Sequence, residues 1–242
     1  MRHPGNQSFQ HRQKQRSSGH GSRRDRAGLS AEKALNVLPP LIAGCCLLVY
    51  WGSVVRKALR FARKEAHGVN LIPRERAGRW IRVVWIPTIV AWCVQPWLAL
   101  RNTFHHSPHD LTWTVVGLVG AAICVSATTA TFSCWREMGR SWRIGIDPEE
   151  KTQLIFSGPF RIVRHPIYAL SILLVLGTLA TTPTLVMLVI AIVHIACLQF
   201  EARREEIYLL GKHGNVYAIY MKRVGRFFPR ASSFAIDEPS SR

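Results

Sequence analysis

Residues 167–200 read IYALSILLVLGTLATTPTLVMLVIAIVHIACLQF and contain no Asp, Glu, Lys or Arg. A membrane-spanning helix needs about 20 apolar residues at a rise of about 1.5 Å per residue, so this run is too long for one straight span. Pro183 lacks a backbone donor and disfavours a helical residue before it. The run therefore predicts two short helices that meet in a turn at residues 181–184, each extended by a few polar residues at its far end.

Three further apolar runs lie upstream, over residues 36–55, 83–100 and 111–135. Any one of them is also compatible with a buried helix of a soluble protein. Four such runs in a chain of 242 residues that is 48% hydrophobic are typical of an integral membrane protein. We therefore expect an all-α, polytopic membrane protein with about five transmembrane helices.

The positive charges predict which side of the membrane each connection faces, because cytoplasmic loops are enriched in Lys and Arg. The chain has a net charge of +18, and the connections over residues 56–82 and 136–164 and the C-terminal segment are strongly basic. The connection over residues 101–110 holds a single Arg, and the turn at 181–184 is neutral. This alternation fits five spans with a cytosolic C-terminus.

The composition divides the chain into four segments. Residues 1–33 form a basic tail rich in Ser, Gln, Gly and Arg, which we expect to be disordered, as we do for the tail at 231–242. Residues 34–134 hold the N-terminal transmembrane helices, and residues 135–230 hold a polar segment, the helical hairpin and the C-terminal motifs. Five spans would place the basic N-terminal tail outside, so either the other loops outweigh it or the first run does not fully cross.

The cysteines and the histidine cluster give weak signals. All six cysteines lie within or at the ends of apolar runs, without a C-x-x-C pair, and are expected to act as small hydrophobic residues. His105, His106 and His109 have the side chains of a metal site, but Asp110 is their only carboxylate neighbour. We therefore expect no metal site there.

The polar segment before the hairpin ends in Arg164-His165-Pro166-Ile167-Tyr168. Pro166 suits the first position of a helix, which places His165 at or next to the N-cap. Tyr168 lies three residues further on, so the His165 and Tyr168 side chains share one side of the chain. A helix N-terminus beside Arg164 and His165 attracts an anion such as a carboxylate. A juxtamembrane turn with an interfacial His and Tyr fits the same pattern equally well.

Acidic residues follow the hairpin directly. Carboxylates at a membrane boundary are costly unless they are paired or solvated. Glu201 and Glu205 lie one turn apart, and the arginines at 203 and 204 can pair with them, which would make a salt-bridged helix end. A functional carboxylate would instead meet a cation or bind ligand hydroxyls. Residues 211–214 are expected to break the helix, and residues 215–224 to restart it.

Two motifs of this region resemble one known family. Ser157-Gly158-Pro159-Phe160 with Arg164-His165-Pro166-Ile167-Tyr168 resembles the "GPY…RHPxY" signature of the isoprenylcysteine carboxyl methyltransferase and phospholipid methyltransferase family. The family's C-terminal signature resembles Glu205-Glu206-x-x-Leu209, Gly214-x-x-Tyr217-x-x-Tyr220-x-x-Arg223-Val224 and Phe227-x-Pro229. The resemblance covers roughly residues 135–230 in matching order.

The resemblance implies a membrane-integral methyltransferase that binds S-adenosylmethionine at the cytosolic ends of its last helices. The cofactor-binding residues that it implies are Thr152, Gln153, Leu154, Ile155, Phe160, His165, Pro166, Tyr168, Glu205 and Glu206. His165, Tyr168 and Glu205 are the implied catalytic residues. Within the site, His165 suits the donor's carboxylate, a glutamate suits its amine or ribose, and the ring of Trp142 or Tyr168 suits its sulfonium.

Three positions depart from the family pattern. Phe160 replaces a Tyr and therefore lacks its hydroxyl. Gly225 stands where the family often has Pro, which we expect to loosen the final turn. Glu201 aligns with an Arg that the eukaryotic carboxyl methyltransferases place before their acidic cluster, which argues against a prenylcysteine carboxylate as substrate.

The expected acceptor is a lipophilic or membrane-associated small molecule with a carboxylate, amine or thiol, which reaches the site from the bilayer. Membrane lipids are the expected partners, and no specific nucleic acid is expected. Two rival functions are a nicotinamide-dependent lipid or isoprenoid reductase, since sterol reductases resemble this family near their C-terminus, and a non-enzymatic membrane protein with a decayed pocket. The chain lacks the length expected for a dinucleotide site, and the retention of His165 and Glu205-Glu206 argues against decay.

Overall fold

The computed structural model describes residues 34–60, 62–63, 76–103, 111–139 and 154–231. The helix Ala34–Arg60, α2 (Arg76–Thr103), α3 (Leu111–Met138) and α5 (Leu185–Arg223) are each long and apolar enough to cross a membrane. The fifth helix, α4 (Pro166–Thr181), is apolar but shorter, at about 24 Å. The all-α, polytopic prediction is confirmed, and the length of α4 leaves its full crossing a prediction.

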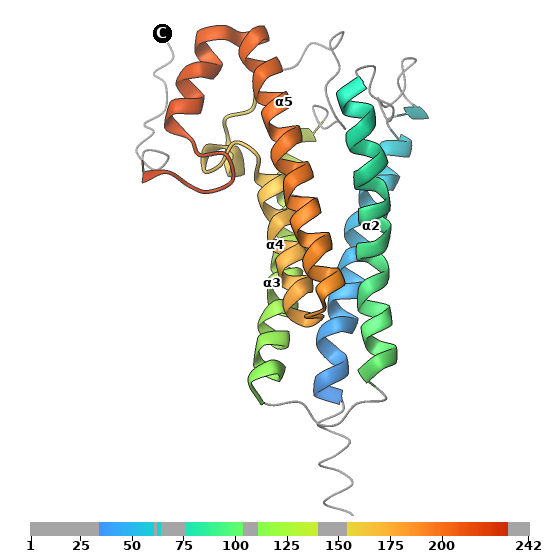
Figure 1. The fold of residues 1–242 in the computed structure, drawn as a ribbon. Helices are drawn as coiled ribbons and strands as arrows, with labels where there is room; N and C mark the ends of the chain where they lie inside the picture. The colour runs from blue at the N-terminus through green and yellow to red at the C-terminus, as the bar shows by residue number, and fades with distance from the viewer. Residues whose placement is uncertain (1–33, 61, 64–75, 104–110, 140–153, 232–242) are drawn as a thin grey trace, which may run out of the picture.

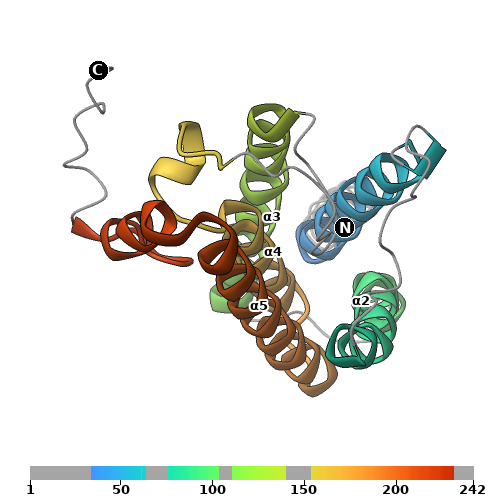
Figure 2. The same ribbon diagram turned by 90° about the horizontal axis from the view of Figure 1, so that it is seen from above.

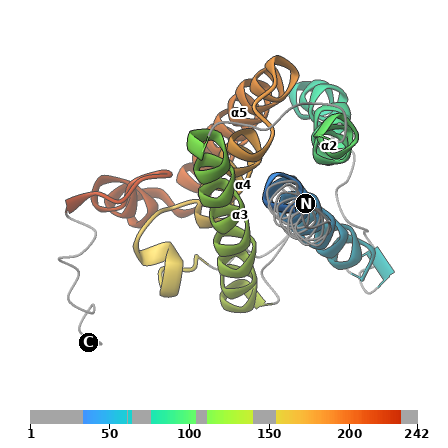
Figure 3. The same cartoon turned by 90° about the horizontal axis from the view of Figure 1, so that it is seen from below.

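Successive helices run in opposite directions in one bundle (Figure 1). The end of the bundle that holds Arg60, Arg76, Met138 and Pro166 is called the His165 end below, and the main part of α5 also runs to it. Seen along the bundle, α3, α4 and α5 lie next to one another, while α2 flanks α5 (Figures 2 and 3). The hairpin α4–α5 is therefore central to the bundle.

Small residues bring α3 and α4 into close contact. A Cβ atom on Gly120 would lie 2.7 Å from the Gly177 carbonyl oxygen, and one on Gly177 would lie 2.8 Å from the Gly120 carbonyl oxygen. Close approach at paired glycines is a common way for membrane helices to pack without a hydrophobic driving force between them. The outward faces of the helices carry exposed apolar side chains, as expected for contact with lipid: Leu48, Val49, Val83, Val90, Val119, Val189 and Ile192.

The predicted turn and the predicted helix break are both confirmed. The turn lies between the end of α4 at Thr181 and the start of α5 at Leu185, where the Thr184 side chain accepts a hydrogen bond from the Met187 amide. Gly214 has φ 53° inside α5, a left-handed conformation that favours glycine. Beyond Gly214 the helix turns back beside the His165 end (Figure 1, red), and this brings residues 224–229 to the segment before α4.

Some sequence-based expectations lie outside the described residues. These are the disordered tail at 1–33, nearly all of the tail at 231–242, the histidine cluster at 105–109, and the site residues Trp142, Thr152 and Gln153. The first apolar run is described and forms one continuous helix through Pro39 and Pro40. Within the described residues, no group of three or more His, Cys, Asp or Glu is placed to hold a metal ion.

The directions of the helices predict an outcome for labelling in cells. In a background without native cysteines, single cysteines at Ser157 and Ala231 should react with an impermeant maleimide from the same, cytosolic side. A cysteine at Pro183, in the turn at the opposite end, should react from the other side. Labelling of positions 157 and 231 from opposite sides would contradict the predicted topology.

Candidate functional site

The segment before α4 is fixed by the C-terminal segment. The Arg164 amide donates to the Gly225 carbonyl at 2.8 Å, and the His165 amide donates to the Arg226 carbonyl at 3.1 Å. Val163 and Gly225 form a parallel β-bridge. As predicted, His165 is the N-cap residue of α4 and Pro166 its first residue. His165 is therefore positioned by residues about sixty positions further along the chain.

Gly225 makes this docking possible. A Cβ atom at this position would lie 1.8 Å from the Phe228 carbonyl oxygen, which no side chain can tolerate without movement of the backbone. Glycine therefore permits a turn in which the backbone of residues 225–228 folds closely on itself. The expectation that glycine loosens the final turn stays a prediction.

Glu206 is the centre of a buried ion cluster, and its side chain is only 4% exposed. Arg164 donates to its Oε1 from Nε at 3.0 Å and from Nη2 at 2.9 Å. Arg226 donates from Nε to Oε1 at 3.0 Å and from Nη2 to Oε2. His165 Nε2 lies 3.3 Å from the same Oε1. Protein groups therefore occupy both carboxylate oxygens, and Glu206 joins α5 to the segments on either side of the hairpin.

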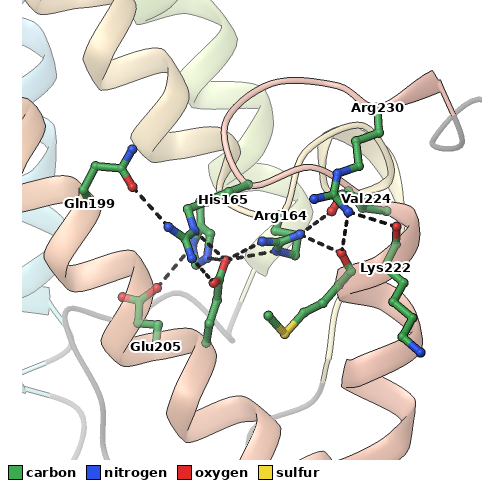
Figure 4. Close-up of polar contacts among 10 residues, drawn as sticks. Arg164, His165, Gln199, Glu205, Lys222, Val224 and Arg230 are labelled. Atoms are coloured by element: carbon green, nitrogen blue, oxygen red, sulfur yellow. Dashed lines mark hydrogen bonds and ion pairs between the residues drawn. The ribbon is translucent and has the colours of Figure 1, made fainter.

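Arg164 differs from the expectation that it helps to attract a free anion. Besides Glu206, its Nη1 donates to the carbonyls of Met221, at 3.0 Å, and Val224. Figure 4 shows Arg164 and His165 lying between α5 and the C-terminal segment. The same view shows Arg230, whose Nη1 donates to the carbonyls of Met221 and Lys222 at the end of α5. These arginines hold the C-terminal segment in place.

Glu205 has a different environment from Glu206, although it is the preceding residue. Tyr168 Oη donates to Glu205 Oε1 at 2.5 Å, and His165 Nδ1 lies 3.4 Å from Glu205 Oε2. The rings of His165 and Tyr168 are stacked, with centroids 5.5 Å apart. The Glu205 side chain is 23% exposed, so it keeps a surface that a ligand can reach. The three residues implied as catalytic are thus brought together.

The charge of His165 is controlled by the two glutamates. Burial by itself lowers the pKa of this imidazole, since it disfavours the charged form. The contacts with Glu205 and Glu206 raise the pKa and outweigh burial, so that the pKa of His165 lies above its usual value. A positive His165 is therefore favoured between the two carboxylates.

Of the other residues that the resemblance implies, Leu154, Ile155 and Phe160 lie close to the site, and Thr152 and Gln153 lie outside the described residues. Leu154 and Ile155 are half-buried and precede the 3-10 helix η2 (Gly158–Arg161), which contains Phe160. The Phe160 carbonyl accepts a hydrogen bond from Tyr220 Oη at 2.6 Å, so the region after the Gly214 kink also packs on η2. Glu201 forms the salt bridge expected of a helix end, since Arg204 Nη1 lies 3.0 Å from both of its oxygens.

Two arginines were not assigned to the site from the sequence. Arg226 lies in the C-terminal segment, and only the turn at Gly214 brings it to Glu206. Arg82 lies on α2, and its buried Nε has no hydrogen-bond partner among the described residues. For Arg82, the only signal in the sequence was its position directly before the apolar run at 83–100, and a cation at such a position is a common feature of membrane helices.

Part of this chain matches a known family and two known proteins. Residues 115–215 match the phospholipid methyltransferase family, a range that contains His165, Tyr168, Glu205 and Glu206. A nickel-cobalt-cadmium resistance protein of Alcaligenes xylosoxydans xylosoxydans is 29% identical over 130 residues, 53% of this chain and 58% of the relative. A cobalt-zinc-cadmium resistance protein of Cupriavidus metallidurans is 28% identical over 171 residues, 68% of each chain.

Proposed function

We propose that the protein is an integral membrane methyltransferase that transfers a methyl group from S-adenosylmethionine to a lipophilic acceptor. The match of residues 115–215 to the phospholipid methyltransferase family supports this proposal. The observation that carries this proposal is the convergence of His165, Tyr168 and Glu205 at the end of the hairpin, inside the matched region. The site faces the cytosol in this proposal, where the donor is made.

The residues present fit a donor with an ammonium group and a ribose diol. Glu205 offers a partly exposed carboxylate that is oriented by Tyr168 and His165. Glu206 is saturated by arginines, so its role is to hold the walls of the site together. Further contacts with the donor are proposed for Thr152, Gln153, Leu154, Ile155 and Phe160. Pro166 starts the helix that carries Tyr168.

Bound S-adenosylmethionine supplies an electrophilic methyl group on a cationic sulfur. The protein's part is to hold donor and acceptor in line, since an in-line displacement gains most from positioning. With a donor held there, a lone pair of the acceptor would form the new bond to the methyl carbon, and the electrons of the broken bond would stay on the sulfur. An amine or thiol acceptor that arrives protonated also releases a proton, and Glu205 offers a partly exposed carboxylate that could accept it. The metals in the relatives' names describe those proteins, and the acceptor proposed here is organic.

Direct binding tests this function against its rivals. The purified protein in detergent should bind S-adenosylmethionine, and S-adenosylhomocysteine should compete, in isothermal titration. A nicotinamide dinucleotide titrated into the same preparation should give no heat of binding. A folded sample that binds neither sulfur ligand at millimolar concentration would contradict the proposal, and binding of the dinucleotide instead would favour a reductase.

A further inference from the structure

Arg82 is placed by a contact between α2 and α5. Trp85 Nε1 donates to His194 Nδ1 at 3.0 Å, which joins one face of α2 to the buried face of α5. Arg82 lies three residues before Trp85, and Glu201 lies seven residues after His194, so each shares a helix face with its contact residue. The two helices run in opposite directions (Figure 1), so both charged residues lie towards the His165 end from this contact.

The side chain of Arg82 reaches the region of the proposed active site. The Trp85–His194 contact and the opposite directions of α2 and α5 put Arg82 on the Glu201 side of that contact, and its charge lies within electrostatic reach of Tyr168 and Glu201. The side chain is half-buried, and its Nε atom is buried without a hydrogen-bond partner among the residues that the structure describes. A buried donor of a charged group is costly when it is unpaired.

The neighbouring carboxylates are bound by other groups. Glu201 holds Arg204 with both oxygens, and Glu206 holds two arginines. Glu205 faces Tyr168 and His165. None of these hydrogen bonds involves Arg82, so among the described residues its Nε keeps a donor for a further anion, although Glu201 lies within reach of its charge.

We propose that Arg82 binds the carboxylate of a reactant, either the methionine carboxylate of the methyl donor or an acidic head group of the lipophilic acceptor. This inference rests on the proposed function for the identity of the reactants. It also gives α2, which lies outside residues 115–215, a direct part in ligand binding. A planar guanidinium with several donors suits a carboxylate better than a Lys ammonium does.

Four proteins distinguish the two sources of the carboxylate: the wild type, Arg82→Gln, Arg82→Lys and the control Arg79→Gln, which changes an exposed arginine of the same helix. The donor probes are S-adenosylmethionine and its decarboxylated analogue. The acceptor probes are cis-parinaric acid, a fluorescent fatty acid, and its methyl ester. All are titrated in a detergent without phosphate, so that no lipid phosphate competes.

If the donor supplies the carboxylate, Arg82→Gln should lower the affinity for S-adenosylmethionine by about ten-fold or more and leave the affinity for the decarboxylated analogue unchanged. If the acceptor supplies the carboxylate, Arg82→Gln should lower the affinity for the fatty acid and leave the affinity for its methyl ester unchanged. In either case Arg82→Lys should bind at an intermediate level, and Arg79→Gln should match the wild type.

Equal binding of all four probes by the wild type and Arg82→Gln would overturn the inference and leave Arg82 as an interfacial arginine. An equal effect of Arg79→Gln would overturn it too, because the cause would then be the total charge. The proposed function fails separately if the wild type does not bind S-adenosylmethionine. If the wild type binds no S-adenosylmethionine and also binds the fatty acid no more tightly than its ester, both the proposed function and the role of Arg82 are overturned.

Discussion

Glu206→Gln should lower the stability of the folded protein by about 3–5 kcal/mol, the usual effect of breaking a buried ion pair from one side. The substitution keeps the shape of the side chain but leaves Arg164 and Arg226 without their counter-charge. A loss of this size corresponds to a fall of roughly 6–20 °C in the unfolding midpoint. A thiol-reactive dye reports unfolding directly in detergent, because Cys124, Cys134 and Cys197 are buried and free.

Glu205→Gln is the matched control for this experiment. It removes the same charge from the adjacent residue of the same helix, but from a side chain that is 23% exposed and retains an oxygen for the Tyr168 hydroxyl. Its cost should stay within about 0.5–1.5 kcal/mol. Equal midpoints for Glu206→Gln and the wild type would show that the Glu206 cluster is not the tie between the hairpin and the C-terminal segment.

The largest effect on the donor is expected from Glu205. If its carboxylate accepts a hydrogen bond from the donor's ammonium or ribose, Glu205→Gln removes a charge-assisted interaction worth about 1.5–3 kcal/mol. The affinity for S-adenosylmethionine should then fall about ten-fold to more than a hundred-fold, as measured by titration of folded protein. His165→Ala should lower the affinity for the donor by about two-fold or more, because Glu205 then loses a group that orients its carboxylate.

Arg203→Gln supplies the comparison, since Arg203 is exposed on the same turn of α5. An exposed ion pair contributes only about 0–1 kcal/mol, so this variant should bind the donor almost as the wild type does. Unchanged donor affinity in folded Glu205→Gln and His165→Ala would restrict both residues to a structural role. Together with Glu206→Gln, these variants separate two adjacent glutamates by function: one affects mainly the fold and the other mainly the donor.

The different roles of Glu205 and Glu206 could not be predicted from the sequence. Both are glutamates of one motif, and the resemblance implied a cofactor contact for each. The difference arises because Glu206 points towards Arg164 and Arg226, whereas Glu205 points towards Tyr168. Helical spacing alone indicated that adjacent residues face different directions, but the identity of the partners depends on where the C-terminal segment returns.

Local patterns of the sequence determined the helices and their breaks. Apolar runs of suitable length, Pro183 in the turn, Pro166 after His165 and glycine at 214 each act on the backbone within a few residues. The order of the motifs also indicated that His165 and Glu205 lie at one end of a hairpin, because a hairpin returns the chain to the side that it left. These features need no knowledge of distant contacts.

Only the tertiary structure decided which charges are paired. The partners of Glu206 come from both sides of the hairpin, and the docking of Gly225 beside Arg164 depends on a backbone approach that no local rule predicts. Arg82 comes from a helix outside the recognised motifs and reaches the site through the packing of Trp85 against His194. Propensity and hydropathy act along the chain, whereas ion pairs form between groups that meet in space, so the pairing followed from the packing of the helices.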